Sequence, residues 1–206
     1  VRELLLGHPS AWLMVERACG LAQWLPGRPI LTRPSEYSAS MLGLVDDFQA
    51  ALAGYAEDRR QAREHGDEPS QAWILARTSQ LECLTGAWDE AIRHVRTGEE
   101  LLVQAGQPAN TAFLLASRAL IEAHLGHADV ARRTGEAALE LAGHTNAVIG
   151  RHIAAWALGL LALSLEQPAD AHAYLGPLVA EIRAAGIREP GGMRFVPDDV
   201  EALVAL

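Results

Sequence analysis

The 206-residue chain contains no lysine, so its 17 basic residues are all arginine. A phosphate-binding loop of the Gly-rich Lys-Ser/Thr type needs a lysine, so this segment has no such loop. The formal net charge is −9. A protein that binds duplex nucleic acid needs clustered positive charge to displace counterions, and an acidic chain lacks it overall. We therefore expect no direct nucleic-acid binding by this segment.

Cysteine is scarce as well, because only Cys19 and Cys83 occur and neither has a CxxC or histidine-spaced partner. Two cysteines in a chain of this length form neither a disulfide framework nor a zinc knuckle. Cys83 falls on the apolar face of a predicted helix, where it behaves as a small buried hydrophobe. A reducing, cytoplasmic setting is the expectation.

Long apolar runs are also missing. The longest, from Ile153 to Leu165, is shorter than the roughly 20 residues that a membrane span needs. The apolar run at the start of the chain is too short for a secretory signal and is soon followed by Glu16 and Arg17. We expect no membrane partner. Because the first residue is not methionine and the last helix lacks a partner, we expect a piece of a longer protein.

No pattern of reactive side chains points to chemistry. His124 and His127 are three residues apart, but Gly126 lies between them at a predicted helix end and no third metal ligand is evident. No G-x-S-x-G elbow occurs. Three of four carboxylate pairs lie at predicted helix starts, where the helix dipole favours negative charge. The four carboxylate pairs are Asp46-Asp47, Asp89-Glu90, Glu99-Glu100 and Asp198-Asp199. The sequence thus predicts no catalytic residue, no metal, no cofactor and no enzyme.

The most informative feature that is present is an internal repeat. Ala51, Ala91, Ala131 and Ala171 lie 40 residues apart, and each opens the second helix of a predicted helical hairpin. A fixed period of this length is typical of stacked helix pairs, none of which can bury its apolar face without a neighbour. The predicted fold is therefore all-α, a right-handed superhelix of stacked helical hairpins. Such arrays present surfaces to partners.

The repeat divides the chain into four segments. Residues 1–35 form an N-terminal helix, predicted over 12–24, and a proline-rich connection; residues 36–66 form a degenerate first hairpin. Residues 67–187 form three regular hairpins, and residues 188–206 form a loop and the first helix of a truncated further repeat. In the middle hairpin, Asp129 is expected to cap the second helix, which should end near Ala142-Gly143.

Two stretches, GDEPSQAW over 66–73 and LECLTGAWDEA over 81–91, resemble tetratricopeptide-like repeats. Together with GIREP over 186–190 and FVPDDVEALV over 195–204, they are most similar to the repeat region of large ATP-dependent LuxR-family regulators of actinobacteria, relatives of the maltose regulator MalT. The resemblance covers about residues 36 to 206. The arginine- and alanine-rich composition, which suggests GC-rich codons, agrees with such a source. The period of 40 exceeds the usual 34, so groove positions cannot be transferred by number.

In that family an ATPase module precedes the repeats and a helix-turn-helix module follows them. The resemblance implies that this chain is the intervening sensor arm, which receives a small-molecule inducer or a regulatory protein. An alternative is a stand-alone adaptor that joins two proteins. The unpaired last helix argues against the adaptor, because the end of a solenoid needs a polar cap and this helix would expose apolar residues. The alternative is that these residues form a homodimer; they are Val200, Leu203, Val204 and Leu206.

Aromatic residues recur near one point of the first helix in successive repeats: Trp73, Phe113 and Trp156. This helix lines the concave side of tetratricopeptide-like stacks. With nearby polar residues, the aromatic residues form a candidate groove for a peptide or an amphipathic small molecule. The alternative is that they wedge between stacked helices as core. The polar residues are Arg77, Gln80, Ser117 and Arg151.

Overall fold

The computed structural model describes residues 1–22, 29–105 and 108–206, and every regular element among them is helical. Two short pieces come first, α1 (Arg2–Leu5) and α2 (Ser10–Ala22). Four hairpins follow, and the chain finishes with α11 (Val196–Ala205). The hairpins are α3 (Pro34–Leu44) with α4 (Phe48–Glu64), α5 (Glu68–Leu84) with α6 (Trp88–Ala105), α7 (Pro108–His124) with α8 (Ala128–Thr145), and α9 (Val148–Ser164) with α10 (Pro168–Ala184). Short 3₁₀ turns lie at Ile30–Thr32 (η1) and Pro190–Gly192 (η2). The all-α stack of helical hairpins is confirmed.

The second helices keep the repeat register without a slip. They begin at residues 48, 88, 128 and 168, and the four repeat alanines are each the fourth residue of such a helix. All four are at most 1% exposed. A small side chain at this position lets the second helix approach its neighbours closely, which explains why alanine marks the period.

The turn inside each hairpin also follows the period. Gly86 and Gly126 adopt positive φ, as expected for residues that close a helix, and so do Asp46 and Glu166 at the corresponding positions. The two acidic residues take a conformation that glycine adopts more easily. Turn geometry therefore follows the repeat more strictly than turn sequence does.

Two local predictions are wrong. Asp129 does not cap α8, because His127 is the N-cap residue and Asp129 lies in the first turn. The same helix continues through Gly143 to Thr145, where Asn146 in the left-handed conformation ends it. The predicted end of the first helix at Trp24, and part of the proline-rich connection, lie outside the described residues.

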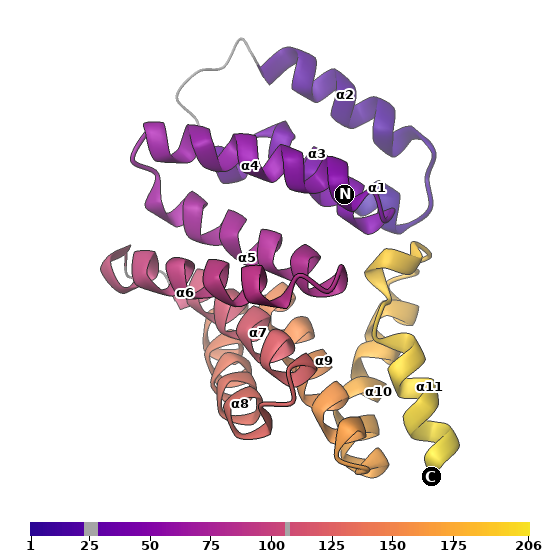
Figure 1. Cartoon of the computed structure of the whole chain (residues 1–206). Helices are drawn as coiled ribbons and strands as arrows, with labels where there is room; N and C mark the ends of the chain where they lie inside the picture. Colours follow the sequence, from indigo (N-terminus) through magenta and orange to yellow (C-terminus); the bar gives the residue numbers. More distant parts are fainter. Residues whose placement is uncertain (23–28, 106–107) are drawn as a thin grey trace.

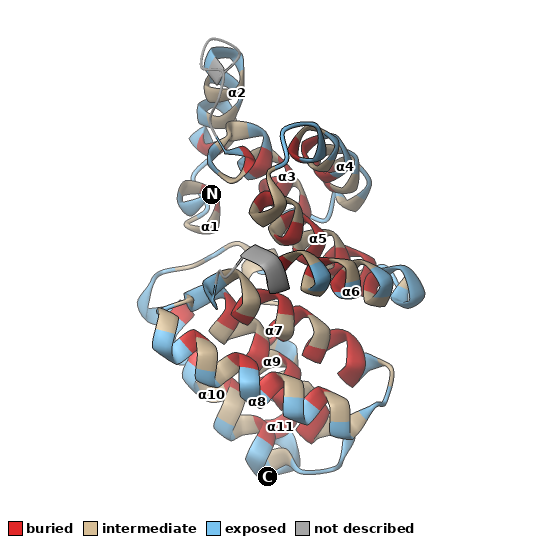
Figure 2. Ribbon diagram, turned by 90° about the vertical axis from the view of Figure 1, so that its left-hand side faces the viewer, coloured by how far each residue is buried: buried red, intermediate tan, exposed pale blue. Residues whose placement is uncertain are grey.

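Buried apolar residues form a series of clusters from one hairpin to the next (Figure 2). The largest lies between α5, α6 and α7 and includes Val95, Leu114 and Ile121. Each first helix packs against its own second helix, and α5, α7 and α9 also follow one another in contact, as α7 does with α9. No helix in the described ranges is long and apolar enough to cross a membrane.

The two ends of the stack meet. The backbone N–H groups of Arg188 and Glu189 donate to the Leu5 carbonyl oxygen at 2.7 and 3.1 Å. The Arg194 guanidinium donates to the Gly43 carbonyl oxygen at 3.0 Å and pairs with the Asp46 carboxylate. Figure 1 shows the segment before α11 next to α1. The Arg194 contacts link residues 151 and 148 positions apart, and the contacts with Leu5 span a longer stretch still. We call these contacts the terminal closure.

Helix α11 packs against α9 and α10 and leaves one face open to solvent. Val200, Leu203, Val204 and Leu206 are all at least half exposed on it. The exposure expected for these residues is therefore present. The homodimer suggested for this helix stays a prediction.

Candidate functional site

Five of the seven candidate groove residues lie together where α5 faces α7. The Trp73 and Phe113 rings stack with their centroids 4.3 Å apart and their planes at 24°. One α-helical turn further along, the Gln80 side-chain amide donates to the Ser117 hydroxyl at 2.8 Å. Phe113 and Ser117 are buried, whereas Trp73, Arg77 and Gln80 are half-buried.

Arg77 is the centre of this cluster. Its Nε donates to the Tyr55 hydroxyl at 3.1 Å, and its two terminal nitrogens donate to Ser40 at 3.2 Å and Gln80 at 3.4 Å. Burial opposes the charge, but Tyr55 and the Glu36 carboxylate outweigh burial and hold the pKa of Arg77 above its ordinary value. The guanidinium is therefore a permanent cation whose hydrogen-bond partners are mainly neutral.

A buried carboxylate completes the cluster. Glu36 is 4% exposed and accepts hydrogen bonds from the Ser40 hydroxyl and the Trp73 indole, both at 3.1 Å. The Ser40 and Tyr55 hydroxyls are themselves 2.9 Å apart. We call the connected set the hairpin-bridging network, because it joins α3, α4, α5 and α7. Its members are Glu36, Ser40, Tyr55, Trp73, Arg77, Gln80, Phe113 and Ser117.

Sequence reasoning missed Glu36, Ser40 and Tyr55. A usable signal existed, because the pairs Glu36–Trp73, Ser40–Arg77 and Gln80–Ser117 all join residues 37 positions apart. This spacing is the 40-residue period less three, about one helical turn. Polar residues that recur at this spacing on successive first helices are candidates for contacts between hairpins.

The other two candidates lie elsewhere. Arg151 donates to both oxygens of the Glu181 carboxylate on α10, at 2.9 and 2.8 Å. This hydrogen bonding lowers the pKa of Glu181. The Trp156 indole donates to the Asp198 carboxylate on α11 at 2.7 Å. Arg151 thus links α9 to α10, and Trp156 links α9 to α11. Neither of these hydrogen bonds involves the hairpin-bridging network.

Histidines and cysteines occupy structural positions. The His94, His127 and His172 rings each lie 2.7 Å from a buried carboxylate, namely Glu82, Glu122 and Asp199. Within residues 1–22, 29–105 and 108–206, no group of three or more His, Cys, Asp or Glu side chains is arranged to hold a metal ion. Burial raises the pKa of the Cys83 thiol to about 12, so at neutral pH it is not a thiolate.

The fold and its register define an all-helical repeat protein, whose central feature is a polar network between hairpins. No family model matches the chain. A search of curated proteins also gives no match.

Proposed function

We propose that this chain is a non-catalytic interaction and sensor module, the arm that holds the inducer or protein partner in an ATP-dependent LuxR-family regulator. The regulator family rests on the resemblance of residues 66–91 and 186–204. Support for a sensor comes from the hairpin-bridging network. Its cation, Arg77, is half-buried and joins α5 to α3 and α4 through hydrogen bonds to neutral partners.

A network of this kind gives a ligand a way to change the packing of hairpins. A carboxylate or phosphate oxygen that reaches Arg77 forms an ion pair as well as hydrogen bonds, whereas the present partners of Arg77 are neutral oxygens and offer no opposite charge. The Tyr55 and Ser40 hydroxyls then lose a donor, and α3 and α4 are held less tightly to α5. A ligand shifts an equilibrium only through such a difference between two states.

The first test is the mass of the native product, measured by immunoblot and mass spectrometry with an antibody raised against this chain. A product several times larger than 22.1 kDa supports the regulator arm. The larger product should then bind ATP and promoter DNA through its other modules. A product near 22 kDa contradicts the arm and leaves the adaptor.

The sensing part needs its own test on the native product. Metabolite and peptide panels are screened for a rise in melting temperature, which any ligand specific for the folded state produces. Arg77→Gln should remove the response, whereas Arg93→Gln should keep it, because Arg93 is exposed and pairs only locally with Glu90. If no compound shifts the wild type, or both variants respond alike, the network does not sense.

The stand-alone adaptor is the second candidate, and the terminal closure favours it. Backbone bonds from Arg188 and Glu189 to Leu5 tie the last loop to the first helix, as in a self-contained unit. Under this function two partner proteins bind one molecule together. Analytical ultracentrifugation of the three purified proteins distinguishes a ternary complex from competing binary complexes.

A further inference from the structure

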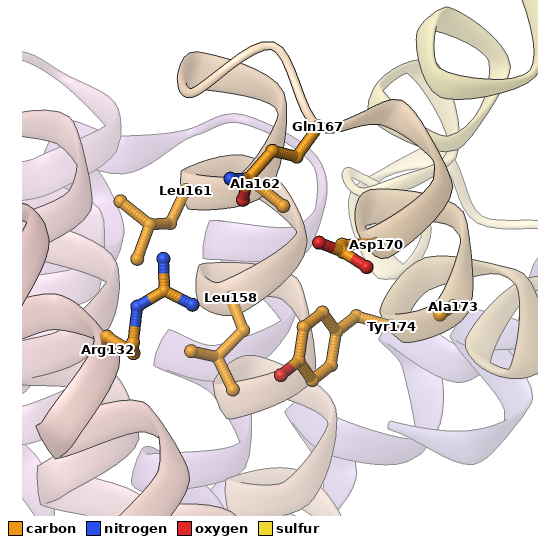
Figure 3. A pocket seen from close by; sticks show the side chains of 8 residues that line it. All are labelled: Arg132, Leu158, Leu161, Ala162, Gln167, Asp170, Ala173 and Tyr174. Carbon is orange, nitrogen blue, oxygen red and sulfur yellow. The ribbon is translucent and has the colours of Figure 1, made fainter. Parts of the chain in front are cut away.

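A hollow lies between α8 and α10, with α9 as its floor. Its volume is about 260 Å³. Figure 3 shows the Arg132 guanidinium at one side and the Asp170 carboxylate at the other, with Gln167 and Tyr174 along the rim. The floor is apolar and consists of Leu158, Leu161 and Ala162, all buried. We call it the α8–α10 hollow.

The repeat shows why this hollow exists. Counting back by 40 residues, Ala162 corresponds to Glu122 and Glu82. Both glutamates are buried, at 4% and 9% exposed, and each places its carboxylate 2.7 Å from a histidine ring. In the fourth hairpin, α9–α10, the shorter alanine takes that position. The hollow is therefore where the two earlier hairpins hold a carboxylate of their own.

The facing position changes in the opposite sense. Arg132 on α8 corresponds to Ile92 on α6 and Leu52 on α4, which are half-buried and pack against the apolar clusters around those helices. At the contact between α8 and α9, the first helix α9 lacks the carboxylate, and a guanidinium from α8 of the preceding hairpin lies beside that position. The pair of changes leaves a cation next to an apolar space that a carboxylate fills elsewhere in the same stack.

The polar groups of the hollow are free to bind. The side chains of Arg132, Gln167, Asp170 and Tyr174 form no hydrogen bond or ion pair with any residue in the part of the chain that the structure describes. A guanidinium binds a carboxylate through two parallel hydrogen bonds. The Asp170 carboxylate at the opposite side can only accept hydrogen bonds, so it favours a ligand with a donor at that end. The volume is just below the range of drug-sized pockets, so the ligand is small.

We propose that the α8–α10 hollow binds a small organic monocarboxylate with a short apolar body and a hydrogen-bond donor at its far end. The carboxylate pairs with Arg132 in the position of the missing glutamate. The apolar body lies over Leu158 and Leu161, and the donor reaches Asp170. This site is separate from the hairpin-bridging network and does not depend on membership of a regulator.

The test uses two ligand series and their neutral controls. The acids are 4-hydroxybenzoate, benzoate, 6-hydroxyhexanoate and hexanoate, and each is paired with its amide. Binding is followed by two-dimensional NMR of the whole chain in a buffer free of carboxylate and phosphate. We expect saturable shifts on α8, α9 and α10 with acids, binding at least about tenfold weaker with amides, and tighter binding of the hydroxylated acids. Shifts that are equal for acids and amides, or absent up to about 10 mM acid, overturn the site.

Two variants taken from the other repeats sharpen the test. Arg132→Ile restores the residue type of Ile92 and should abolish acid binding, whereas the neighbouring Arg133→Ile should retain it. Ala162→Glu restores the internal carboxylate and should block the acids, because it occupies the hollow and pairs with Arg132. Equal losses in Arg132→Ile and Arg133→Ile would mean general attraction of anions and contradict the proposal. Unchanged binding in a folded Ala162→Glu protein contradicts it as well.

Discussion

Replacing Trp73 by phenylalanine is the most direct test of the hairpin-bridging network. The substitution keeps a ring that can stack on Phe113 but removes the indole N–H that donates to Glu36 at 3.1 Å. Glu36 is 4% exposed, so water cannot easily replace the lost donor. Its remaining hydrogen bond comes from the Ser40 hydroxyl.

The expected cost follows from these contacts. A hydrogen bond to a buried charged group contributes about 1.5–3 kcal/mol, so Trp73→Phe should lower the free energy of unfolding by about 2 kcal/mol. Trp73→Ala also loses the stacked ring and its buried area, and should cost about 4 kcal/mol in total. With a urea dependence of about 3 kcal/mol per molar, the midpoints should fall by about 0.7 and 1.3 M.

Urea titrations followed by far-UV circular dichroism measure these shifts without relying on tryptophan fluorescence. Trp88→Phe is the matched control, because the Trp88 indole donates to a backbone carbonyl, that of Cys83, and its side chain is 40% exposed. This control should lose no more than about 1 kcal/mol. If Trp73→Phe costs no more than the control, the indole–carboxylate bond does not stabilise the stack. If Trp73→Ala leaves stability unchanged and removes ligand binding, Trp73 belongs to an open groove.

Three further predictions concern other parts of the molecule. A methyl group on Gly191 would lie 1.9 Å from a carbonyl oxygen of α3, so Gly191→Ala should open the terminal closure and cost about 1–3 kcal/mol. Gly192→Ala meets only side chains, the nearest being the flexible end of Leu5, and should cost less; hydrogen exchange of α11 compares the two variants. Cys83 is buried with a thiol pKa of about 12, so Ellman's reagent at pH 8 should modify the half-exposed Cys19 and reach Cys83 only on unfolding. Burial raises the pKa of Asp58 in the folded state. As the pH rises above the pKa that Asp58 has in the unfolded chain, ionisation of this carboxyl therefore favours unfolding. Asp58→Asn should raise the melting temperature at pH 7 but not near pH 3. Equal melting temperatures at pH 7 would contradict that assignment.

Part of the candidate site followed from the sequence. The 40-residue period placed Trp73 and Phe113 at equivalent positions on successive first helices, and the structure stacks them. The period did not indicate that Arg151 pairs with Glu181 or that Trp156 donates to Asp198. These partners lie 30 and 42 residues further along the chain, so the two contacts do not share one sequence spacing. Nor did it single out the hollow beside Arg132, since only the packed hairpins show that Ala162 faces it.

By itself the sequence determined the helical class, the period and the positions of most turns. These depend on local properties, namely the spacing of apolar residues, small residues at repeat contacts and the left-handed conformation at Gly86 and Gly126. The tertiary structure alone decided which side chains pair across hairpins and that Leu5 meets Arg188. Such pairs depend on the crossing angles and offsets of whole helices, which many weak contacts set together and no short stretch of sequence encodes.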